Sequence, residues 1–437
     1  MLTAFARAFR TPDLRRKILF TLGIIALFRF GSQLPTPGVD AGAINRCIDL
    51  ALGGENAGLY GLINLFSGGA LLQLSVFALG IMPYITASII IQLLTVVIPR
   101  LEALKKEGQA GTARLTQYTR YLTVALAVLQ STAFIAIARQ PGRLFQGCSE
   151  PIVDPDLNIW GILTMIITMT AGTAVIMWFG ELITDRGVGN GMSLLIFTQI
   201  VATFPQQMWV IKRQAGWDSF LIVMAVGLVL VAAVIFIEQG QRRIPVQYAK
   251  RMIGRRMYGG TSTYIPLKVN QAGVIPVIFA SSLLYLPALA AQMGDPTSSW
   301  AVWIQRNLVN GTGWIYMASF FLMIVFFTYF YVGITWNPVE VADNMKKYGG
   351  FIPGIRAGRP TAEYLQYVLN RITLPGSVYL GLIALIPMIA ISVFGGGVNN
   401  NFPFGGTSIL IMVGVGLDTV KQIESQLQQR NYEGFLR

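Results

Sequence analysis

The residues that most often carry protein chemistry are scarce in this sequence. The chain has 437 residues, no histidine and only two cysteines, Cys47 and Cys148. Without histidine it has no imidazole general base, no Ser-His or Cys-His nucleophile pair and no His-based metal site. Two cysteines cannot form a Cys-rich metal site. We therefore predict no catalytic residues, no metal site and no cofactor.

One glycine-rich run, Gly187 to Gly191, resembles a phosphate-binding loop in composition. Its spacing does not match G-x-G-x-x-G, no predicted strand precedes it, and the chain has no G-x-x-x-x-G-K-[ST] motif. We interpret the run as a turn that begins a helix. The sequence therefore predicts no nucleotide-driven engine within this chain.

The chain as a whole is strongly apolar. Hydrophobic residues make up 54% of the chain and charged residues 12%, whereas a soluble domain carries about 25% charged residues. Apolar stretches of about 20 residues fit helices that cross a hydrocarbon core about 30 Å thick. We expect ten spans, at 18–36, 71–98, 119–138, 158–180, 188–207, 219–237, 271–292, 313–335, 374–394 and 404–420. The first follows a basic stretch without an early cleavage site, so we expect it to be retained.

Lysine and arginine residues indicate which side of the membrane each connecting segment occupies. With ten spans, 26 of the 33 fall in segments on one side and seven on the other. With acidic residues included, one face carries +14 and the other −1. The positive-inside rule then places the basic face and both termini in the cytoplasm. Cys47 and Cys148 lie on the opposite side, where a disulfide is permitted; the sequence leaves open whether they form one.

Ten spans divide into two halves of five, and the odd number makes the second half enter the membrane from the opposite side. Inverted repeats of this kind are common in transport folds. We assign residues 1–186 to the N-terminal half with spans one to four, and 187–437 to span five followed by the C-terminal half from about 215. Two long basic segments, 238–270 and 336–373, contain turn residues and are expected to be ordered cytoplasmic protrusions.

Charged residues are nearly absent from the predicted spans. Arg29 is the one firmly embedded charge, and Glu181 lies at a span boundary. Ion-coupled transporters usually hold charged groups near the midplane, and intramembrane proteases need an aspartate pair or serine with histidine. A passive or partner-driven conduit fits the sequence best. A secondary transporter of a small solute, built from inverted repeats, remains the alternative.

Six motifs carry a resemblance to a known family. They occur in order along nearly the whole chain, at 66–70 (FSGGA), 77–85 (FALGIMPYI), 240–245 (GQRRIP), 266–270 (PLKVN), 351–358 (FIPGIRAG) and 404–408 (FGGTS). With these motifs the chain resembles the SecY family, the central subunits of the general secretion translocon. The resemblance implies an all-α polytopic membrane protein whose ten transmembrane helices form a clamshell of two inverted five-helix halves.

The resemblance also implies a function without chemistry of its own. Members of the family conduct unfolded preproteins across the bacterial plasma membrane and release apolar helices sideways into membrane lipid. SecE and usually SecG bind the channel, signal sequences open it, and the SecA ATPase or a translating ribosome drives transport. We therefore expect a multi-pass channel of this kind and no enzyme.

The family's resting seal maps onto two sets of residues. A ring of aliphatic side chains dewets and offers a passing chain no polar contact. By resemblance the ring comprises Ile81, Ile85, Met192, Ile196, Ile278 and Ile411. A plug at about 60–68, broken from span two by two glycines, comprises Tyr60, Leu62, Ile63, Asn64, Leu65 and Phe66. So short a helix is marginal alone and can be displaced. Without the resemblance, an isoleucine in a span would be assigned to packing or lipid contact.

The family's side exit and docking sites map onto polar residues. The exit, or lateral gate, runs between spans two and three on one side and seven and eight on the other. Its residues here are Thr86, Ser88, Gln92, Gln130, Ser131, Ser281 and Ser282. Routine helix packing by small polar residues is the alternative for several of them. Arginine binds phosphate and carboxylate through two hydrogen bonds, so we expect Arg255, Arg256 and Arg356 to dock ribosomal RNA or SecA.

Overall fold

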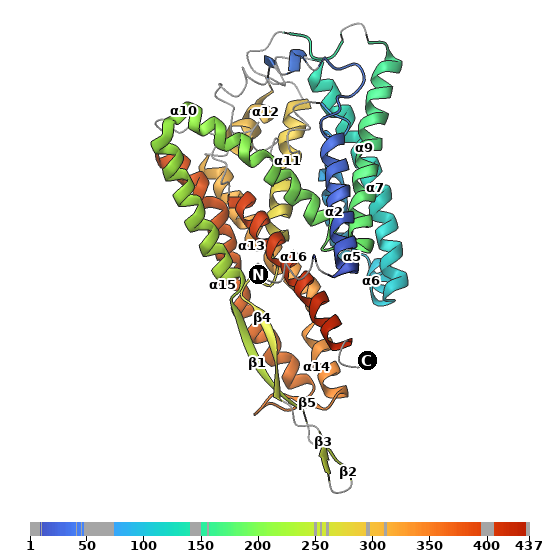
Figure 1. Cartoon of the computed structure of the whole chain (residues 1–437), viewed down its shortest axis with the longest axis vertical. Helices are drawn as coiled ribbons and strands as arrows, with labels where there is room; N and C mark the ends of the chain where they lie inside the picture. The colour runs from blue at the N-terminus through green and yellow to red at the C-terminus, as the bar shows by residue number, and fades with distance from the viewer. Residues whose placement is uncertain are drawn as a thin grey trace.

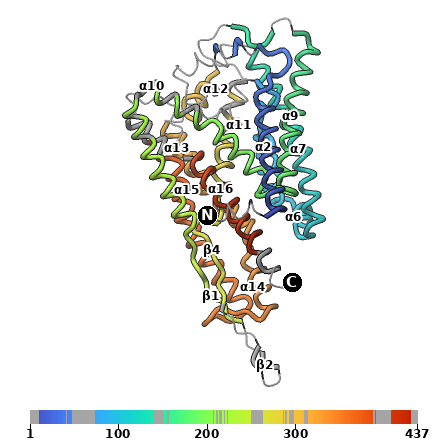
Figure 2. The backbone as a smooth tube through the Cα atoms, viewed as in Figure 1, coloured from blue at the N-terminus to red at the C-terminus, as the bar shows by residue number. Residues whose placement is uncertain are grey.

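The computed structural model describes most of the chain as a helical bundle with a small β-structure at one end (Figures 1 and 2). The described residues are 9, 11–40, 42–44, 46–47, 74–139, 150–154, 157–248, 251–253, 256–258, 262–293, 298–309, 313–394 and 406–433. Figure 1 shows the strands at the lower end of the bundle, which we call the strand end.

The N-terminal part of the bundle consists of closely packed helices. They are α2 (Pro12–Gly31), α5 (Met82–Val97), α6 (Pro99–Lys106), α7 (Gln109–Ala138) and α9 (Ile159–Arg186). Helix α7 packs between α5 and α9, and α2 packs on α9. The described part of predicted span two begins with a turn rather than a helix. Residues 74–81 precede α5 in a non-helical conformation, which includes Gly80 at φ 56°.

Helix α10 (Gly191–Glu238) connects the two parts of the bundle. It is 48 residues long and contains both predicted spans five and six without an intervening loop. Pro205 lies inside it, and proline bends a helix because it removes one backbone hydrogen bond. Figure 1 shows α10 rising from the centre of the bundle, turning at its upper end and descending to the strands.

The C-terminal part completes the bundle. Its elements are α11 (Ile275–Met293), α12 (Ser299–Ile304), the π-helical turn η1 (Gln305–Val309), α13 (Trp314–Thr335), α14 (Pro338–Lys347), α15 (Arg359–Phe394) and α16 (Gly406–Glu433). Helix α13 packs between α11 and α15, and α16 packs on α10. The largest buried hydrophobic cluster lies where these helices meet α5 and α9.

The two long basic segments fold together at the strand end. Strand β1 (Gln241–Tyr248) pairs antiparallel with β4 (Ser262–Lys268) on one edge and with β5 (Gly350–Phe351) on the other. A smaller hairpin, β2 (Arg251–Ile253) with β3 (Arg256–Tyr258), extends beyond them. The larger sheet packs with α14 and the start of α15 around one hydrophobic core, which holds Ile244, Val246, Leu267, Met345, Ile352, Leu365 and Val368. We call β1, β4, β5, α14 and the start of α15 the strand module.

Several helices of the described part are suited to a membrane. Four are long and apolar enough to cross one, at Gln109–Ala138, Ile159–Arg186, Trp314–Lys347 and Arg359–Ile386. The pair Met82–Val97 and Pro99–Lys106, bent by 100°, makes a fifth if counted as one span. Gly191–Pro205, Met224–Glu238 and Ile275–Leu284 are shorter apolar helices. Large apolar side chains such as Phe236, 81% exposed, face outward. The chain is therefore built as a multi-pass membrane protein.

Candidate functional site

The glycine-rich run at 187–191 places the start of α10 against α9. Asn190 caps α10 by accepting hydrogen bonds from the backbone nitrogens of Met192 and Ser193, at 3.1 and 3.3 Å. The nitrogen of Gly191 donates to Thr184 Oγ1 of α9 at 2.9 Å. A Cβ on Gly191 would overlap the carbonyl oxygen of Gly180. The predicted helix-starting turn is thus confirmed.

The six predicted ring residues meet in one apolar cluster. Ile81, Ile85, Ile196, Ile278 and Ile411 are buried, with exposed fractions between 0 and 8%. They belong to the same buried cluster, and Met192 packs against it. They come from the turn before α5 and from α5, α10, α11 and α16, which are elements of both parts of the bundle. The fold therefore gathers these aliphatic side chains into one buried cluster from segments up to 330 positions apart in the sequence.

Met192 differs from the other five in its immediate contact. Its thioether lies over Gly180 of α9, so closely that a Cβ at that position would overlap the sulfur. Methionine is flexible enough to fill such a space. In this structure Met192 therefore joins the cluster by packing on α9.

The predicted plug residues lie outside the described part of the chain, but the segment that follows them is described. Leu74 is buried and adopts φ 44°, a left-handed conformation that costs a residue with a side chain on the order of 1–3 kcal/mol. Its carbonyl accepts a hydrogen bond from the nitrogen of Thr36 at 3.0 Å, and the nitrogen of Val76 donates to Leu34 at 2.8 Å. These contacts fix the chain at the point where span two begins.

The predicted gate residues lie on helices that meet where the two parts of the bundle are in contact. Helix α11 packs against α5 and α7, and the end of α13 faces α5, α6 and α7 across a cavity; we call this whole boundary between the two parts of the bundle the seam. Of the predicted set, Thr86, Gln130, Ser131 and Ser282 are buried, and Ser88, Gln92 and Ser281 are half-buried. The structure therefore places all seven on the helices that form the seam.

The hydroxyl groups at the seam bond mainly to their own helices. Thr86 Oγ1 donates to the carbonyl of Met82 at 3.0 Å, and Ser281 Oγ donates to that of Ile278 at 2.9 Å. Ser131 Oγ donates to Val128 and lies 3.5 Å from Thr170 Oγ1 on α9. Such bonds leave the hydroxyls of Thr86, Ser131 and Ser281 satisfied when the facing helix moves, whereas the buried hydroxyl of Ser282 has no hydrogen-bond partner among the described residues. Packing therefore contributes more to closure of the seam than these hydroxyls do.

A cavity of about 450 Å³ opens at the strand end of the seam. Its walls come from α5, α6 and α7 on one side and from the end of α13 on the other. Hydroxyl and amide groups are frequent in the lining, which includes Tyr84, Ser88, Gln92, Thr95, Lys105, Thr112, Thr116, Thr119, Tyr331 and Thr335. Two predicted gate residues, Ser88 and Gln92, thus line a cavity of mixed polar and apolar character.

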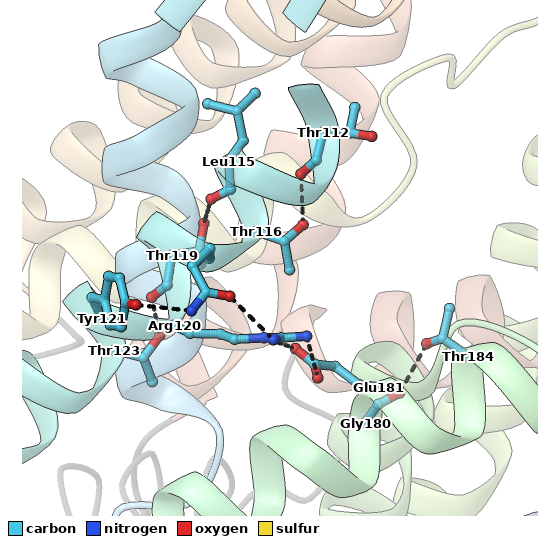
Figure 3. Close-up of polar contacts among 11 residues, drawn as sticks. Thr112, Leu115, Thr116, Thr119, Arg120, Tyr121, Thr123, Gly180, Glu181 and Thr184 are labelled. Carbon is cyan, nitrogen blue, oxygen red and sulfur yellow. Dashed lines mark hydrogen bonds and ion pairs between the residues drawn. The ribbon is translucent and has the colours of Figure 1, made fainter. Parts of the chain in front are cut away.

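An ion pair behind the seam was not foreseen from the sequence. Arg120 of α7 contacts Glu181 of α9 through two hydrogen bonds of 2.8 Å each, as Figure 3 shows. The two charges stand at the ends of neighbouring apolar stretches on the same side of the predicted membrane. That placement is the signal from which the pair could have been found, since consecutive antiparallel spans bring such ends together.

Two of the three predicted docking residues, Arg256 and Arg356, lie at the strand end. Arg356 is exposed between β5 and α15, and its carbonyl accepts a hydrogen bond from Thr361 Oγ1 at 2.8 Å. Gly354 and Gly358, with φ of 82° and 105°, form the turns on either side of it. Arg256 begins β3, and Arg255 lies outside the described residues.

The end of the bundle opposite the strands contains a covalent link. Cys47 is fully buried and disulfide-bonded; Cys148, the other cysteine of the chain, lies outside the described residues. Beside it, Arg46 and Glu150 form an ion pair of 2.8 Å, which raises the pKa of Arg46. The sequence left open whether the cysteines form a disulfide, and the structure shows that Cys47 does.

Comparisons with known proteins agree on one family. The SecY family model matches residues 75–420. The protein translocase subunit SecY of Streptomyces scabiei is 70% identical over 442 residues, and that of Mycobacterium tuberculosis strain H37Rv is 60% identical over 443; both alignments cover 100% of each chain. These matches give no support to the secondary transporter considered above.

Solved structures share the fold. One described as a protein-conducting channel has a TM-score of 0.61 at 18% identity and covers 94% of this chain and 91% of its own. Sec61 in the canine ribosome-channel complex has a TM-score of 0.58 at 17% identity, with the same coverage. The family model spans most of the chain and the relatives match it from end to end, so this chain belongs to the SecY family.

Proposed function

We propose that this chain is a protein-conducting channel that passes unfolded preproteins across a membrane and releases transmembrane helices laterally into lipid. The observation that carries the proposal is the aliphatic cluster drawn from both parts of the bundle, next to the seam of α11 with α5 and α7. The relatives that match over the full length bear the name protein translocase subunit. A channel rather than an enzyme accounts for both.

The cluster suits a passage for polymers. Aliphatic side chains form no hydrogen bonds with a moving peptide, and a narrow apolar constriction loses its water at rest and so blocks ions. We propose that Ile81, Ile85, Met192, Ile196, Ile278 and Ile411 form this ring, and that residues 60–66 form the plug beside it. The seven seam residues would line the lateral gate, whose weak polar contacts an entering apolar helix can replace.

We further propose the full family architecture and setting for this chain. Ten transmembrane helices would form a clamshell in the bacterial plasma membrane, with both termini and the strand module in the cytoplasm. The charge difference of +14 against −1 between the two faces supports this orientation. The division near the middle of α10 would separate the two halves, because that helix turns at the end opposite the strands (Figure 1).

The strand module is the proposed docking site for the driving partners. Exposed Arg356 lies between β5 and α15, and we include in the docking site the hairpin beyond the module, with Arg256 and its neighbour in sequence Arg255. A solved relative of the same fold is Sec61 in a ribosome-channel complex. We propose SecE and SecG as bound subunits, and SecA or a ribosome as the motor that delivers preproteins with their signal sequences.

Preprotein import into vesicles tests this function. Vesicles that contain the chain with SecE and SecG should import a preprotein when SecA and ATP are added. Uptake of a small solute without any preprotein import would refute the proposal.

A matched pair of variants tests the docking site in the same assay. We expect Arg356→Glu to reduce import at least tenfold while SecE still copurifies. Arg114→Glu is the control, because Arg114 is an exposed arginine of α7 that lies outside the strand module. Equal import by the Arg356→Glu and Arg114→Glu variants would remove Arg356 from the proposed docking site.

A further inference from the structure

Lys105 reaches across the seam at its strand end. Helix α5 ends at Val97, and α6 leaves at an angle of 100°. This bend brings α6, which belongs to the N-terminal part, to the last turn of α13. There Lys105 Nζ donates a hydrogen bond to the carbonyl oxygen of Ile334 at 3.2 Å, across 229 positions of sequence.

The chemistry of the acceptor explains why a lysine binds there. The last four carbonyl groups of a helix have no partner within it, and they carry the negative end of the helix dipole. Helix α13 ends at Thr335, so the carbonyl of Ile334 belongs to this set. The last turn of α13 contains no basic residue of its own. Lys105 therefore supplies the positive charge that this helix end favours.

The hydrogen bond between Lys105 and Ile334 joins the two walls of the seam. Lys105 and Ile334 both line the cavity described above, and the cavity separates α7 from the end of α13. A bond across this mouth exists only while the two walls are close. A contact present in one state and absent in the other shifts the balance between them by the free energy of that contact.

We propose that Lys105 is a positioning residue that latches the seam at its strand end and sets how often the resting channel opens sideways. The inference rests on the proposed function, in which the seam is the lateral gate. Because the contact is solvent-exposed, the latch is weak. It biases the gate toward the closed state, and an entering apolar helix can release it.

The neighbouring lysine provides a matched control. Lys106 carries the same charge on the same helix, but its Nζ bonds to Glu102 Oε1 at 2.7 Å within α6. The hydrogen bond from Lys106 lowers the pKa of Glu102, which keeps that carboxylate charged. Substituting Lys106 therefore changes the charge of α6 without touching α13.

Distance measurements on the resting channel test the latch. Nitroxide labels at Thr112→Cys and Thr335→Cys stand on opposite walls of the cavity, and both positions are exposed. The channel is purified with its copurifying subunits, reconstituted in nanodiscs without SecA or ribosomes, and measured by double electron-electron resonance. This readout needs no import, so it stays informative even if the proposed function fails.

We expect the fraction of channels with the longer label distance to rise at least threefold in Lys105→Glu, and by less in Lys105→Gln. Lys105→Arg, which keeps the charge, should resemble the wild type, and so should Lys106→Glu. The latch is refuted if Lys105→Glu gives the wild-type distribution, or if Lys106→Glu shifts it equally. A shift in Lys105→Glu by a channel that imports no preprotein would support the latch and refute the proposed function instead.

Discussion

Arg120 and Glu181 join α7 to α9 through a two-bonded ion pair. Arg120 Nε lies 2.8 Å from Glu181 Oε1, and Nη2 lies 2.8 Å from Oε2. The side chains are 41% and 23% exposed, so the pair is only partly screened by solvent. Figure 3 shows the guanidinium of α7 reaching across to the carboxylate of α9. Helix α7 forms one wall of the seam, and this pair ties that wall to the helix behind it.

The first prediction concerns this pair. Arg120→Ala leaves Glu181 without its cation and should destabilise the protein by about 1–2 kcal/mol, with partial exposure reducing the effect. Arg120→Lys should restore part of the loss, because lysine cannot form both bonds. The melting temperature of the purified channel should fall in the order wild type, Arg120→Lys, Arg120→Ala. The double variant Arg120→Glu with Glu181→Arg should be more stable than either single variant. Equal melting temperatures for the wild type and Arg120→Ala would contradict the role of the pair.

The second prediction separates sealing from packing. Ile196 and Ile200 lie one turn apart on α10, are 4% and 1% exposed, and belong to the same cluster. Asparagine at either position buries an amide and should cost about 1–3 kcal/mol of stability. Only Ile196→Asn places that amide in the proposed ring, where it should hydrate the constriction. Conductance of the resting channel in planar bilayers should therefore rise about tenfold or more in Ile196→Asn alone. A leak of the same size in both variants would argue that general loosening is the cause.

The third prediction concerns the contact between α9 and α10. Gly191→Ala should be costly, since its methyl group would overlap the carbonyl of Gly180, and backbone cannot move aside easily. Gly180→Ala meets only the thioether of Met192, which can rotate away. Overpacking of this kind typically costs about 1–3 kcal/mol, so we expect Gly191→Ala at the upper end and Gly180→Ala near or below the lower end. Denaturation midpoints of the two variants should differ in this order; the reverse order would contradict the close approach at Gly191.

The fourth prediction concerns the disulfide at Cys47. Intact mass after alkylation without reductant should show no modified cysteine, because Cys47 is bonded and the chain has two cysteines in all. After unfolding and reduction both should be modified. Loss of a native disulfide commonly costs about 2–4 kcal/mol, so reduction should also lower the melting temperature. Quantitative alkylation of the native, unreduced protein would contradict the bond.

The sequence predicted single elements well and contacts between them less well. Hydropathy located α7, α9 and α13 to within a few residues, apart from an earlier start for α7 and a later end for α9, because each apolar stretch depends on its own residues. The resemblance supplied the isoleucines of the cluster, since their residue types alone look like any packing position. Family membership is confirmed by the matching family model.

Other features depend on distant partners, which a local pattern does not encode. The predicted spans 188–207 and 219–237 left a break between them, yet α10 continues through residues 208–218 as helix. Lys105 looks like an ordinary positive-inside charge until the bend at Pro99 places it beside Ile334. Arg120 and Glu181 lie 61 positions apart, and only the packing of α7 on α9 brings them together.

Helix α15 connects the strand module directly to the bundle. It starts at Arg359, packs Leu365 and Val368 beneath the strands, and continues into the bundle as one helix of 36 residues. At 1.5 Å per residue its length is about 54 Å. On the other side, β1 begins three residues after α10 ends. The strand module is therefore joined to the C-terminal part of the bundle by two direct helical connections, α15 and the end of α10, with no flexible linker of more than a few residues between them.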